Sequence, residues 1–294
     1  MLTIFACPKP FSDPHIALIQ RNAITSWTLL EPRPEIILFG GEPYEQGIRE
    51  ICEELKLRHV PEVRRNEYGT PFLNDLFQKA KELATFDMIC YVNADIILIP
   101  AFMDVIRMVR DWPKLFLIVG GRVEVEIKDL IDYKKGWERD LLNRATKYKF
   151  SYIEKGGIDY FVFKKHLYSD IPDILIGRFW WDDWFPYKAK KLGADIINAT
   201  PYAPAVHQNH SRIYIHDSEI ENNKKVCNSE NFLLLIRSTH IITHKGIKKL
   251  RAVELKHSIL SSLYHFVVYT LGPIRHAIGL RRESLTRVLN ILKK

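Results

Sequence analysis

Hydrophobic residues in the first half of the chain follow two alternating patterns. Short continuous apolar runs predict buried β-strands at residues 2–7, 35–39, 58–60, 88–92 and 116–119. Between these runs, apolar residues recur at helical spacing and predict helices at residues 11–30, 44–55, 71–83 and 101–109. Strands that alternate with helices are typical of an α/β domain, so we expect a Rossmann-like, mostly parallel central sheet with flanking helices.

The second half of the chain is less regular. The sequence predicts strands at residues 159–163 and 195–197 and a helix at residues 180–192. The polar stretch 207–230 is expected to form loops over the edge of the sheet. Beyond it, apolar residues at helical spacing predict a tail of amphipathic helices. We therefore divide the chain into a main α/β domain, residues 1–231, and a C-terminal helical extension, residues 232–294.

The positive charge of the sequence is concentrated in the predicted tail. The 294 residues carry a net charge of +8, with 43 Lys or Arg against 35 Asp or Glu. Residues 232–294 hold 12 of the basic residues and two of the acidic ones, so the tail carries +10 and the main domain −2. The tail contains neither an RNA-binding aromatic motif nor zinc ligands, and the main domain is slightly acidic. We therefore expect no nucleic-acid partner.

Several common motifs are missing from the sequence. No GxGxxG follows the first predicted strand and no GxxxxGK[ST] occurs, which argues against dinucleotide-binding enzymes and P-loop NTPases. The four cysteines are far apart and form no CxxC, so neither a disulfide scaffold nor a zinc finger is indicated. Met1 opens directly into an apolar run without a basic region or a small-residue cleavage site. We therefore expect a cytoplasmic location.

Asn93 and Asp95 directly follow the predicted strand at residues 88–92, in the segment YVNAD. The carboxyl ends of strands in an open α/β sheet face the ligand crevice. The two side chains could send oxygen ligands to the same side, as Mg²⁺ or Mn²⁺ requires. The alternative is a turn in which Asn93 and Asp95 cap the next element.

A pair of carboxylates, Asp182 and Asp183, lies among three tryptophans in the segment WWDDW. Burying a carboxylate is costly unless it has a partner, and apolar surroundings raise its pKa toward that of a general base. The rings of Trp180 and Trp181 would suit the face of a sugar. The alternative is a helix N-terminus that Asp182 caps, with the tryptophans in the core.

Other candidate residues lie in turns and polar loops. His207 and His210, in the segment HQNH, could add an imidazole to a metal site and would favour Mn²⁺ over Mg²⁺, or could be solvated side chains. Lys9, between two prolines, could contact a phosphate or be solvated. The segment NEYGTPFLND could read a nucleotide through its backbone N–H groups and polar side chains, or form a capped turn. Its candidates are Asn66, Gly69, Thr70 and Asn74.

The order of these motifs resembles that of GT-A-fold glycosyltransferases of the family 2 type, over roughly residues 1–215. In that family, the segment resembling NEYGTPFLND lines the nucleotide pocket, and the DxD motif, which Asn93 and Asp95 resemble, holds the metal and the diphosphate. A carboxylate at the position of Asp182 or Asp183 is the base, and a later histidine such as His207 completes the metal site. In this chain Asn93 replaces the first carboxylate of DxD and so removes one negative charge.

The resemblance implies a metal-dependent glycosyltransferase that moves a sugar, with inversion, from a UDP- or GDP-sugar to a hydroxyl of a glycan or lipid-linked acceptor. The implied cofactor is Mn²⁺ or Mg²⁺, held by Asp95, Asn93 and His207. The implied donor contacts are Lys9, Asn66, Gly69, Thr70, Asn74, Asn93 and Asp95. The implied sugar or acceptor contacts are Asp159, Trp180, Trp181 and His210.

Two alternatives and the role of the tail remain open at this point. A sugar-phosphate nucleotidyltransferase would share the general sheet, although the sequence lacks the GxGxR-type loop expected of it. A non-catalytic carbohydrate-binding protein could use the tryptophans. The basic tail is expected to attach the protein peripherally to an anionic membrane surface, on its inner face. Packing of the tail on the main domain, or a dimer contact, is the alternative.

Overall fold

A computed structural model describes residues 1–41, 44, 46–145, 157–211, 215–229 and 238–250. Its elements follow one another in the order β1 (Thr3–Ala6), α1 (Pro14–Thr28), β2 (Glu35–Phe39), α2 (Ile48–Leu55), β3 (Arg58–Val60), α3 (Leu73–Leu83), β4 (Met88–Val92), β5 (Ile96–Ile97), α4 (Ala101–Val109), β6 (Phe116–Val125), α5 (Trp137–Arg144), β7 (Ile158–Lys164), α6 (Trp181–Lys191), β8 (Asp195–Asn198), β9 (Ala205–Gln208), α7 (Asp217–Ser229), β10 (His240–Thr243) and β11 (Gly246–Lys249).

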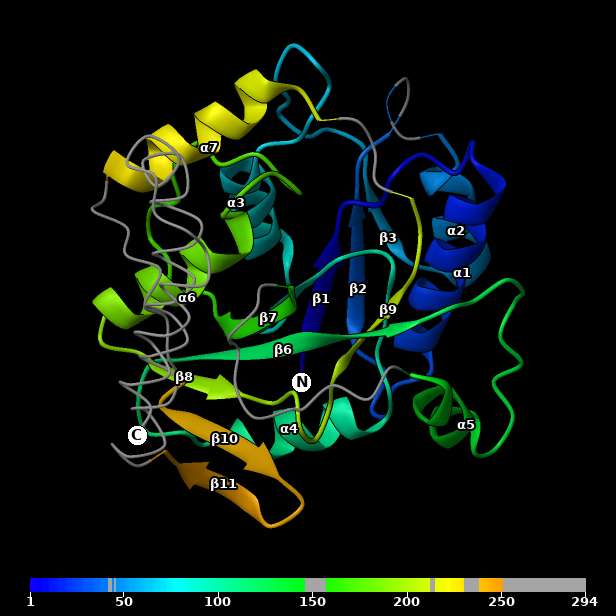
Figure 1. The fold of residues 1–294 in the computed structure, drawn as a ribbon, viewed down its shortest axis with the longest axis vertical. Coiled ribbons are helices and arrows are strands. Elements are labelled where there is room, and N and C mark those ends of the chain that lie inside the picture. The colour runs from blue at the N-terminus through cyan, green and yellow to red at the C-terminus, as the bar shows by residue number, and fades with distance from the viewer. Residues whose placement is uncertain (42–43, 45, 146–156, 212–214, 230–237, 251–294) are drawn as a thin grey trace, which may run out of the picture.

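The strands form one twisted sheet (Figure 1) whose main path runs β11-β10-β8-β6-β7-β4-β1-β2-β3. β1 pairs in parallel with β2 and β4, β2 with β3, and β6 with β8. β7 runs antiparallel between β4 and β6. In a short branch, β9 pairs in parallel with β6 and antiparallel with β5. The expected α/β architecture with a mostly parallel sheet is confirmed.

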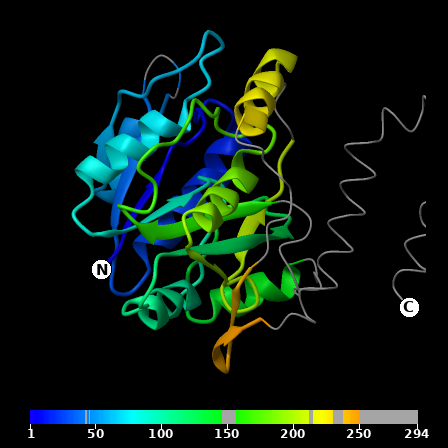
Figure 2. The ribbon, with the colours of Figure 1, turned by 90° about the vertical axis from the view of Figure 1, so that its left-hand side faces the viewer.

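Helices cover both faces of the sheet (Figures 1 and 2). Trp27 of α1 and Phe102 of α4 belong to one core cluster, and Phe77 of α3 and Phe185 of α6 to another. β1 contributes Ile4 to the first cluster and Phe5 to the second. All residues of β1 and β4 are buried, because both of their faces are covered. This burial explains why these strands are continuous apolar runs rather than alternating ones.

The stretch 207–230 is not a series of loops, and that prediction is wrong. His207 and Gln208 end strand β9, and α7 occupies Asp217–Ser229. The buried residues of α7 include Glu219, Asn223 and Cys227, which recur at helical spacing but are mostly polar. A helix that buries polar side chains gives little hydrophobic periodicity by which to recognise it.

The sheet also continues past the predicted boundary at residue 231. Residues 240–249, expected to be helical, form the antiparallel hairpin β10–β11, and β10 pairs in parallel with β8. The predicted amphipathic helices of the far tail fall in residues 251–294, outside the described part of the chain. Among the described residues, no helix is long and apolar enough to cross a membrane.

Candidate active site

Asp95 lies where the central sheet joins its small branch. It precedes β5, whose Ile96 is paired with His207 of β9. The Nε2 atom of His207 is therefore 3.8 Å from Oδ2 of Asp95. His210, just beyond the end of β9, places its Nε2 atom 3.0 Å from the same oxygen. The β5–β9 pairing thus builds an Asp-His-His cluster of Asp95, His207 and His210 from two distant parts of the chain.

The Asp-His-His cluster fits a divalent cation. One ligand atom from each of the three residues lies within 4.8 Å of the others. Oδ1 of Asp95 and Nδ1 of His207 are buried without a hydrogen-bond partner among the described residues, an arrangement that requires an explanation such as a bound ion. Nδ1 of His210 donates to the carbonyl oxygen of Ser211 at 2.7 Å, so its Nε2 can present a lone pair to a metal. Imidazole nitrogens beside a carboxylate suit Mn²⁺ better than Mg²⁺.

The ionisation of the cluster also suits a cation. Burial raises the pKa of Asp95, but the hydrogen bond to His210 and the nearby positive charges outweigh it and lower this pKa to about 2. Burial is also the main cause that lowers the pKa of His207. A carboxylate anion beside a neutral imidazole is the form in which these groups bind metals.

Lys9 brings a positive charge to the same cluster. The side chain of Gln20, in α1, holds the main chain of Lys9 on both sides: the Lys9 N–H donates to Oε1 at 2.6 Å, and Nε2 donates to the Lys9 carbonyl at 2.9 Å. Nζ of Lys9 then lies 4.0 Å from Oδ2 of Asp95 and 3.4 Å from Nε2 of His210. Burial is the main cause that lowers the pKa of Lys9, and Asp95 opposes it.

Asn93 takes part in a different set of contacts. Its Nδ2 donates to Oδ1 of Asp159 at 2.8 Å, and its Oδ1 accepts from the hydroxyl of Tyr91 at 3.2 Å. The metal-ligand role of Asn93 stays a prediction: its amide nitrogen is bound to Asp159, and its Oδ1, the atom that could bind a cation, accepts from Tyr91. His210, for which a sugar or acceptor contact is expected from the sequence, lies beside Asp95 and His207 as the third member of the cluster.

Arg122, which no sequence motif had indicated, lies at the centre of the acidic residues. Its Nε and Nη2 atoms donate to the two carboxylate oxygens of Asp159, at 2.7 and 2.9 Å. Burial opposes the charge of Arg122, but Asp159, and beyond it Asp95 and Asp182, raise its pKa above the usual value. The carboxylate predicted for the metal and the one predicted as base therefore both lie close enough to act on one guanidinium.

Asp182 and Asp183 occupy the first turn of α6, so a helix does begin here, but Trp180 rather than Asp182 is its N-cap residue. Oδ2 of Asp182 accepts a hydrogen bond from the backbone N–H of Gly157 at 3.3 Å. Burial, and next the charge of Asp159, raise the pKa of Asp182. Burial and the charge of Asp182 raise the pKa of Asp183 well above its ordinary value.

The two tryptophans that precede these carboxylates face different surroundings. Trp181 is buried and packs edge-on against Tyr91 and Phe161, with ring centroids 5.6 and 5.7 Å away. It thus belongs to the core rather than to an open sugar-binding wall. Trp180 is partly buried, lies beside Phe179 with centroids 4.9 Å apart, and has a left-handed backbone with φ of 67°. That conformation is rare for a bulky residue and fixes the chain direction just before the two carboxylates.

The segment NEYGTPFLND begins with a tight turn. Oδ1 of Asn66 accepts from the backbone N–H groups of Tyr68 and Thr70, at 3.1 and 2.8 Å. Nδ2 of Asn66 donates to Oε1 of Glu219 at 2.9 Å, so the turn is fastened to α7. Arg178 completes this contact, because it donates to Oε2 of Glu219 at 2.9 Å and to the Thr70 hydroxyl at 2.7 Å. Sequence reasoning missed Arg178 and Glu219, since neither lies in a motif.

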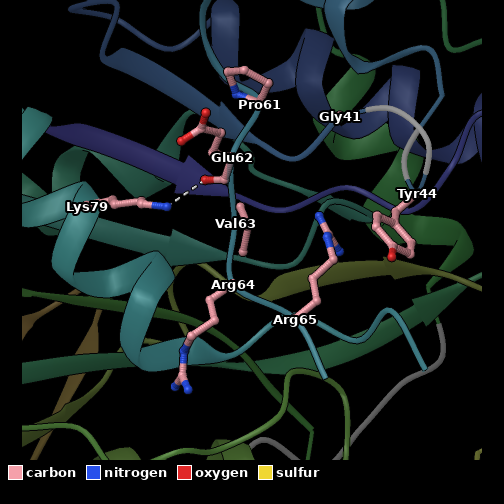
Figure 3. Close-up of a pocket in the computed structure, with 8 residues that line it drawn as sticks. All are labelled: Gly41, Tyr44, Pro61, Glu62, Val63, Arg64, Arg65 and Lys79. Carbon is pink, nitrogen blue, oxygen red and sulfur yellow. Dashed lines mark hydrogen bonds between the residues drawn. The ribbon is translucent and has the colours of Figure 1, made fainter. Parts of the chain in front are cut away.

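A cavity of about 410 Å³ lies at the ends of β2 and β3 (Figure 3). Gly69 lies against Tyr44, one of the residues that line this cavity. Its φ of +80° and the Tyr44 ring, which would lie 2.8 Å from an added Cβ, both require glycine. Arg65 donates to the Gly69 carbonyl at 3.0 Å and lies over the Tyr44 ring. The cavity is lined by Gly41, Tyr44, Pro61, Glu62, Val63, Arg64, Arg65 and Lys79, so its charged groups are mostly cations.

Asn74 is not brought to this cavity or to the Asp-His-His cluster. Its Nδ2 donates to Oδ1 of Asp173 at 2.6 Å, and its Oδ1 accepts from Nη2 of Arg64 at 2.8 Å. These are contacts at the exposed start of α3. Asn74 therefore has a structural partner in place of the nucleotide contact expected of it.

Comparison with known proteins supports the fold. No protein-family model and no curated protein sequence matches the chain. Among solved structures, residues 1–349 of TarS from S. aureus in complex with UDP-GlcNAc match 96% of this chain and 77% of that one, with a TM-score of 0.52 and 11% identity. The mannosyltransferase PcManGT from Pyrobaculum calidifontis, in complex with GDP-Man and Mn²⁺, matches 97% of this chain and 82% of that one, with a TM-score of 0.47 and 12% identity. The match to TarS shows that the chain has a GT-A glycosyltransferase-like fold.

Proposed function

We propose that the protein is a metal-dependent glycosyltransferase that moves a sugar from a UDP- or GDP-sugar to an acceptor hydroxyl. The observation that carries the proposal is that Asp95, of the Asp-His-His cluster, and Asp182, of α6, both lie close enough to Arg122 to raise its pKa, after the larger effect of Asp159. A GT-A-like fold is built to place a nucleotide-sugar at the carboxyl ends of its strands, where both groups lie.

The Asp-His-His cluster would hold the divalent cation. When bound, that cation would neutralise the charge that develops on the departing nucleoside diphosphate. Lys9 would bind the same phosphates, because its Nζ lies 3.4 Å from Nε2 of His210. Arg122 and Arg178 add positive charge nearby, which, after burial, lowers the pKa of Lys9. Together these residues would bind and orient the leaving group.

Asp182 is our candidate for the base that takes the acceptor proton. The Gly157 N–H holds its carboxylate in place, and its raised pKa makes it a better proton acceptor than an exposed aspartate. Asp183, whose pKa burial and then the charge of Asp182 raise well above its ordinary value, is the weaker candidate because its ionised form is the more disfavoured. Attack of the activated hydroxyl on the anomeric carbon would invert its configuration.

The test is release of UDP or GDP from a panel of nucleotide-sugars in the presence of Mn²⁺, together with a panel of glycan and lipid-linked acceptors. We expect Asp95→Ala and Asp182→Asn to abolish turnover, with Asp170→Asn, at an exposed position, as the matched control. Normal rates in Asp95→Ala would remove the metal role. Release of pyrophosphate from a nucleoside triphosphate and a sugar phosphate would identify a nucleotidyltransferase instead.

We also propose that the tail attaches the protein to an anionic membrane surface that carries the acceptor. Its net charge of +10 supports this, because each basic residue near the headgroups contributes about 1 kcal/mol. In the full-length chain, replacing Arg281, Arg282 and Arg287 by Glu should reduce co-sedimentation with vesicles that contain phosphatidylglycerol. Unchanged co-sedimentation would favour a tail that packs on the main domain or on a second copy.

A further inference from the structure

In the metal-binding form of His210, its contact with Asp95 brings two lone pairs together. Nδ1 of His210 donates to the Ser211 carbonyl, so a neutral ring offers Nε2 as an acceptor to a metal. That nitrogen lies 3.0 Å from Oδ2 of Asp95, which is also an acceptor. In this form the two atoms repel each other unless a positive group lies beside both of them, and the hydrogen bond between them exists only when Nε2 carries a proton.

Lys9 places a positive group beside both Oδ2 of Asp95 and Nε2 of His210. Its ammonium nitrogen lies 3.4 Å from Nε2 of His210 and 4.0 Å from Oδ2 of Asp95. Because an ammonium has three N–H donors and no acceptor, it can serve both atoms. The Lys9 charge thus faces the same lone pairs that a divalent cation would need.

The fold holds Lys9 at this position. Gln20, whose exposed fraction is 2%, makes two hydrogen bonds to the main chain of Lys9 from within α1. Proline on either side of Lys9 fixes φ at residues 8 and 10 and limits the conformations of the loop. The stem of Lys9 therefore starts from a fixed point, and only its side chain can move.

We propose that the Lys9 ammonium and a divalent cation compete for Oδ2 of Asp95 and Nε2 of His210, so that the metal binds weakly until a diphosphate draws Lys9 away. This rests on the proposed function only for the identity of the diphosphate. Phosphate oxygens accept from an ammonium at least as well as an imidazole does, so the bound nucleotide offers Lys9 another partner. Metal and nucleoside diphosphate should then increase each other's affinity by the same factor.

The experiment measures binding of Mn²⁺ to the full-length protein from the electron paramagnetic resonance signal of the free ion. Without nucleotide, Lys9→Met should bind Mn²⁺ at least about tenfold more tightly than the wild type, because a positive charge beside the ligand atoms is lost. Lys9→Arg keeps the charge and should bind weakly. Lys134→Met removes an equal charge from a side chain that is 84% exposed and should match the wild type.

A second measurement adds UDP or GDP. The wild type should gain affinity for Mn²⁺ in the presence of the matching diphosphate, whereas Lys9→Met should gain less. A mutation that merely loosened the site would weaken metal binding, so tighter binding by Lys9→Met cannot come from structural damage.

Three results would overturn the proposal. In the first, Lys9→Met binds Mn²⁺ no more tightly than the wild type does. In the second, Lys134→Met gains as much Mn²⁺ affinity as Lys9→Met. In the third, Lys9→Arg binds Mn²⁺ as tightly as Lys9→Met. Failure of the proposed function would be seen in a different result: no nucleotide-sugar would be turned over, whatever the Mn²⁺ affinities. The competition and the transferase activity are therefore tested separately.

Discussion

Arg122 holds both carboxylate oxygens of Asp159 through two hydrogen bonds, from Nε at 2.7 Å and from Nη2 at 2.9 Å. The side chain of Asp159 is 1% exposed, whereas that of Arg122 is 34% exposed. The carboxylate is thus an internal anchor on β7, and the guanidinium on β6 faces outward from it. This pair fixes a cation close to both Asp95 and Asp182.

Asp159→Asn should destabilise the protein by about 3 kcal/mol, at the low end for loss of one partner of a buried ion pair, because Arg122 is partly exposed. The measurement is urea denaturation followed by circular dichroism. Glu54→Gln, in the exposed pair of Arg21 and Glu54, is the matched control and should cost less than about 1 kcal/mol. Equal losses in the two variants would show that the Arg122–Asp159 pair contributes no more than a surface contact.

His210→Gln should lower the affinity for Mn²⁺ at least about tenfold when a nucleoside diphosphate is present, because one of three candidate ligands is lost. His166→Gln alters an exposed histidine outside the cluster and should leave the affinity unchanged. Titration calorimetry with Mn²⁺ gives both values. If His210→Gln binds as tightly as His166→Gln, His210 is not a metal ligand and the cluster has another role.

The contrast between Asn93 and His210 shows what the sequence could predict of this site. Asp95 and His207 could be identified from their motifs. The place of His210 could not, because it depends on the register of β9 against β5, a pairing between distant segments. The spacing of Asn93 also predicts a ligand, but the sequence could not reveal that its amide nitrogen donates to Asp159 of the adjacent strand β7.

The elements of the fold likewise divide into those that the sequence could predict and those that it could not. Strands buried on both faces, such as β1 and β4, are apolar runs that the sequence reveals directly. In α7, by contrast, the buried face carries Asn223, whose amide makes two hydrogen bonds to the main chain of Leu175. A helix held through polar contacts of this kind lacks the hydrophobic pattern on which its prediction depends.

Asp183→Asn should stabilise the protein near neutral pH. The folded-state pKa of Asp183 is raised above that of the unfolded chain, so the folded state binds more protons and loses stability as the pH rises between the two pKa values. An asparagine carries no such penalty. Below about pH 3 the aspartate is protonated in both states and the variant should match the wild type.

Thermal unfolding at a series of pH values tests this prediction. The difference in Tm between Asp183→Asn and the wild type should grow from near zero in acid to a positive value near neutral pH. Asp170→Asn, at an exposed position, should show no such trend. A variant less stable than the wild type at neutral pH would mean that the Asp183 carboxylate is favourably held, and Asp183 would then rival Asp182 as the base.

Glu219→Gln should raise the KM for the nucleotide-sugar about fivefold or more and leave kcat nearly unchanged. The carboxylate of Glu219 is 1% exposed and joins Arg178 to the Asn66 turn, which contains three of the expected donor contacts. The glutamine keeps the shape of the side chain but loses the charge that orients Arg178. Loss of an interaction that serves the bound substrate and the transition state equally changes KM rather than kcat.

Glu221→Gln provides the control from the same helix, because Glu221 is 69% exposed and pairs along α7 with Lys224. Steady-state kinetics of the two variants, with thermal unfolding alongside, separate a local effect on the donor from a general loss of stability. A KM in Glu219→Gln equal to that in Glu221→Gln would mean that α7 does not support donor binding. A fall in kcat with an unchanged KM would instead place Arg178 in contact with charge that develops only in the transition state.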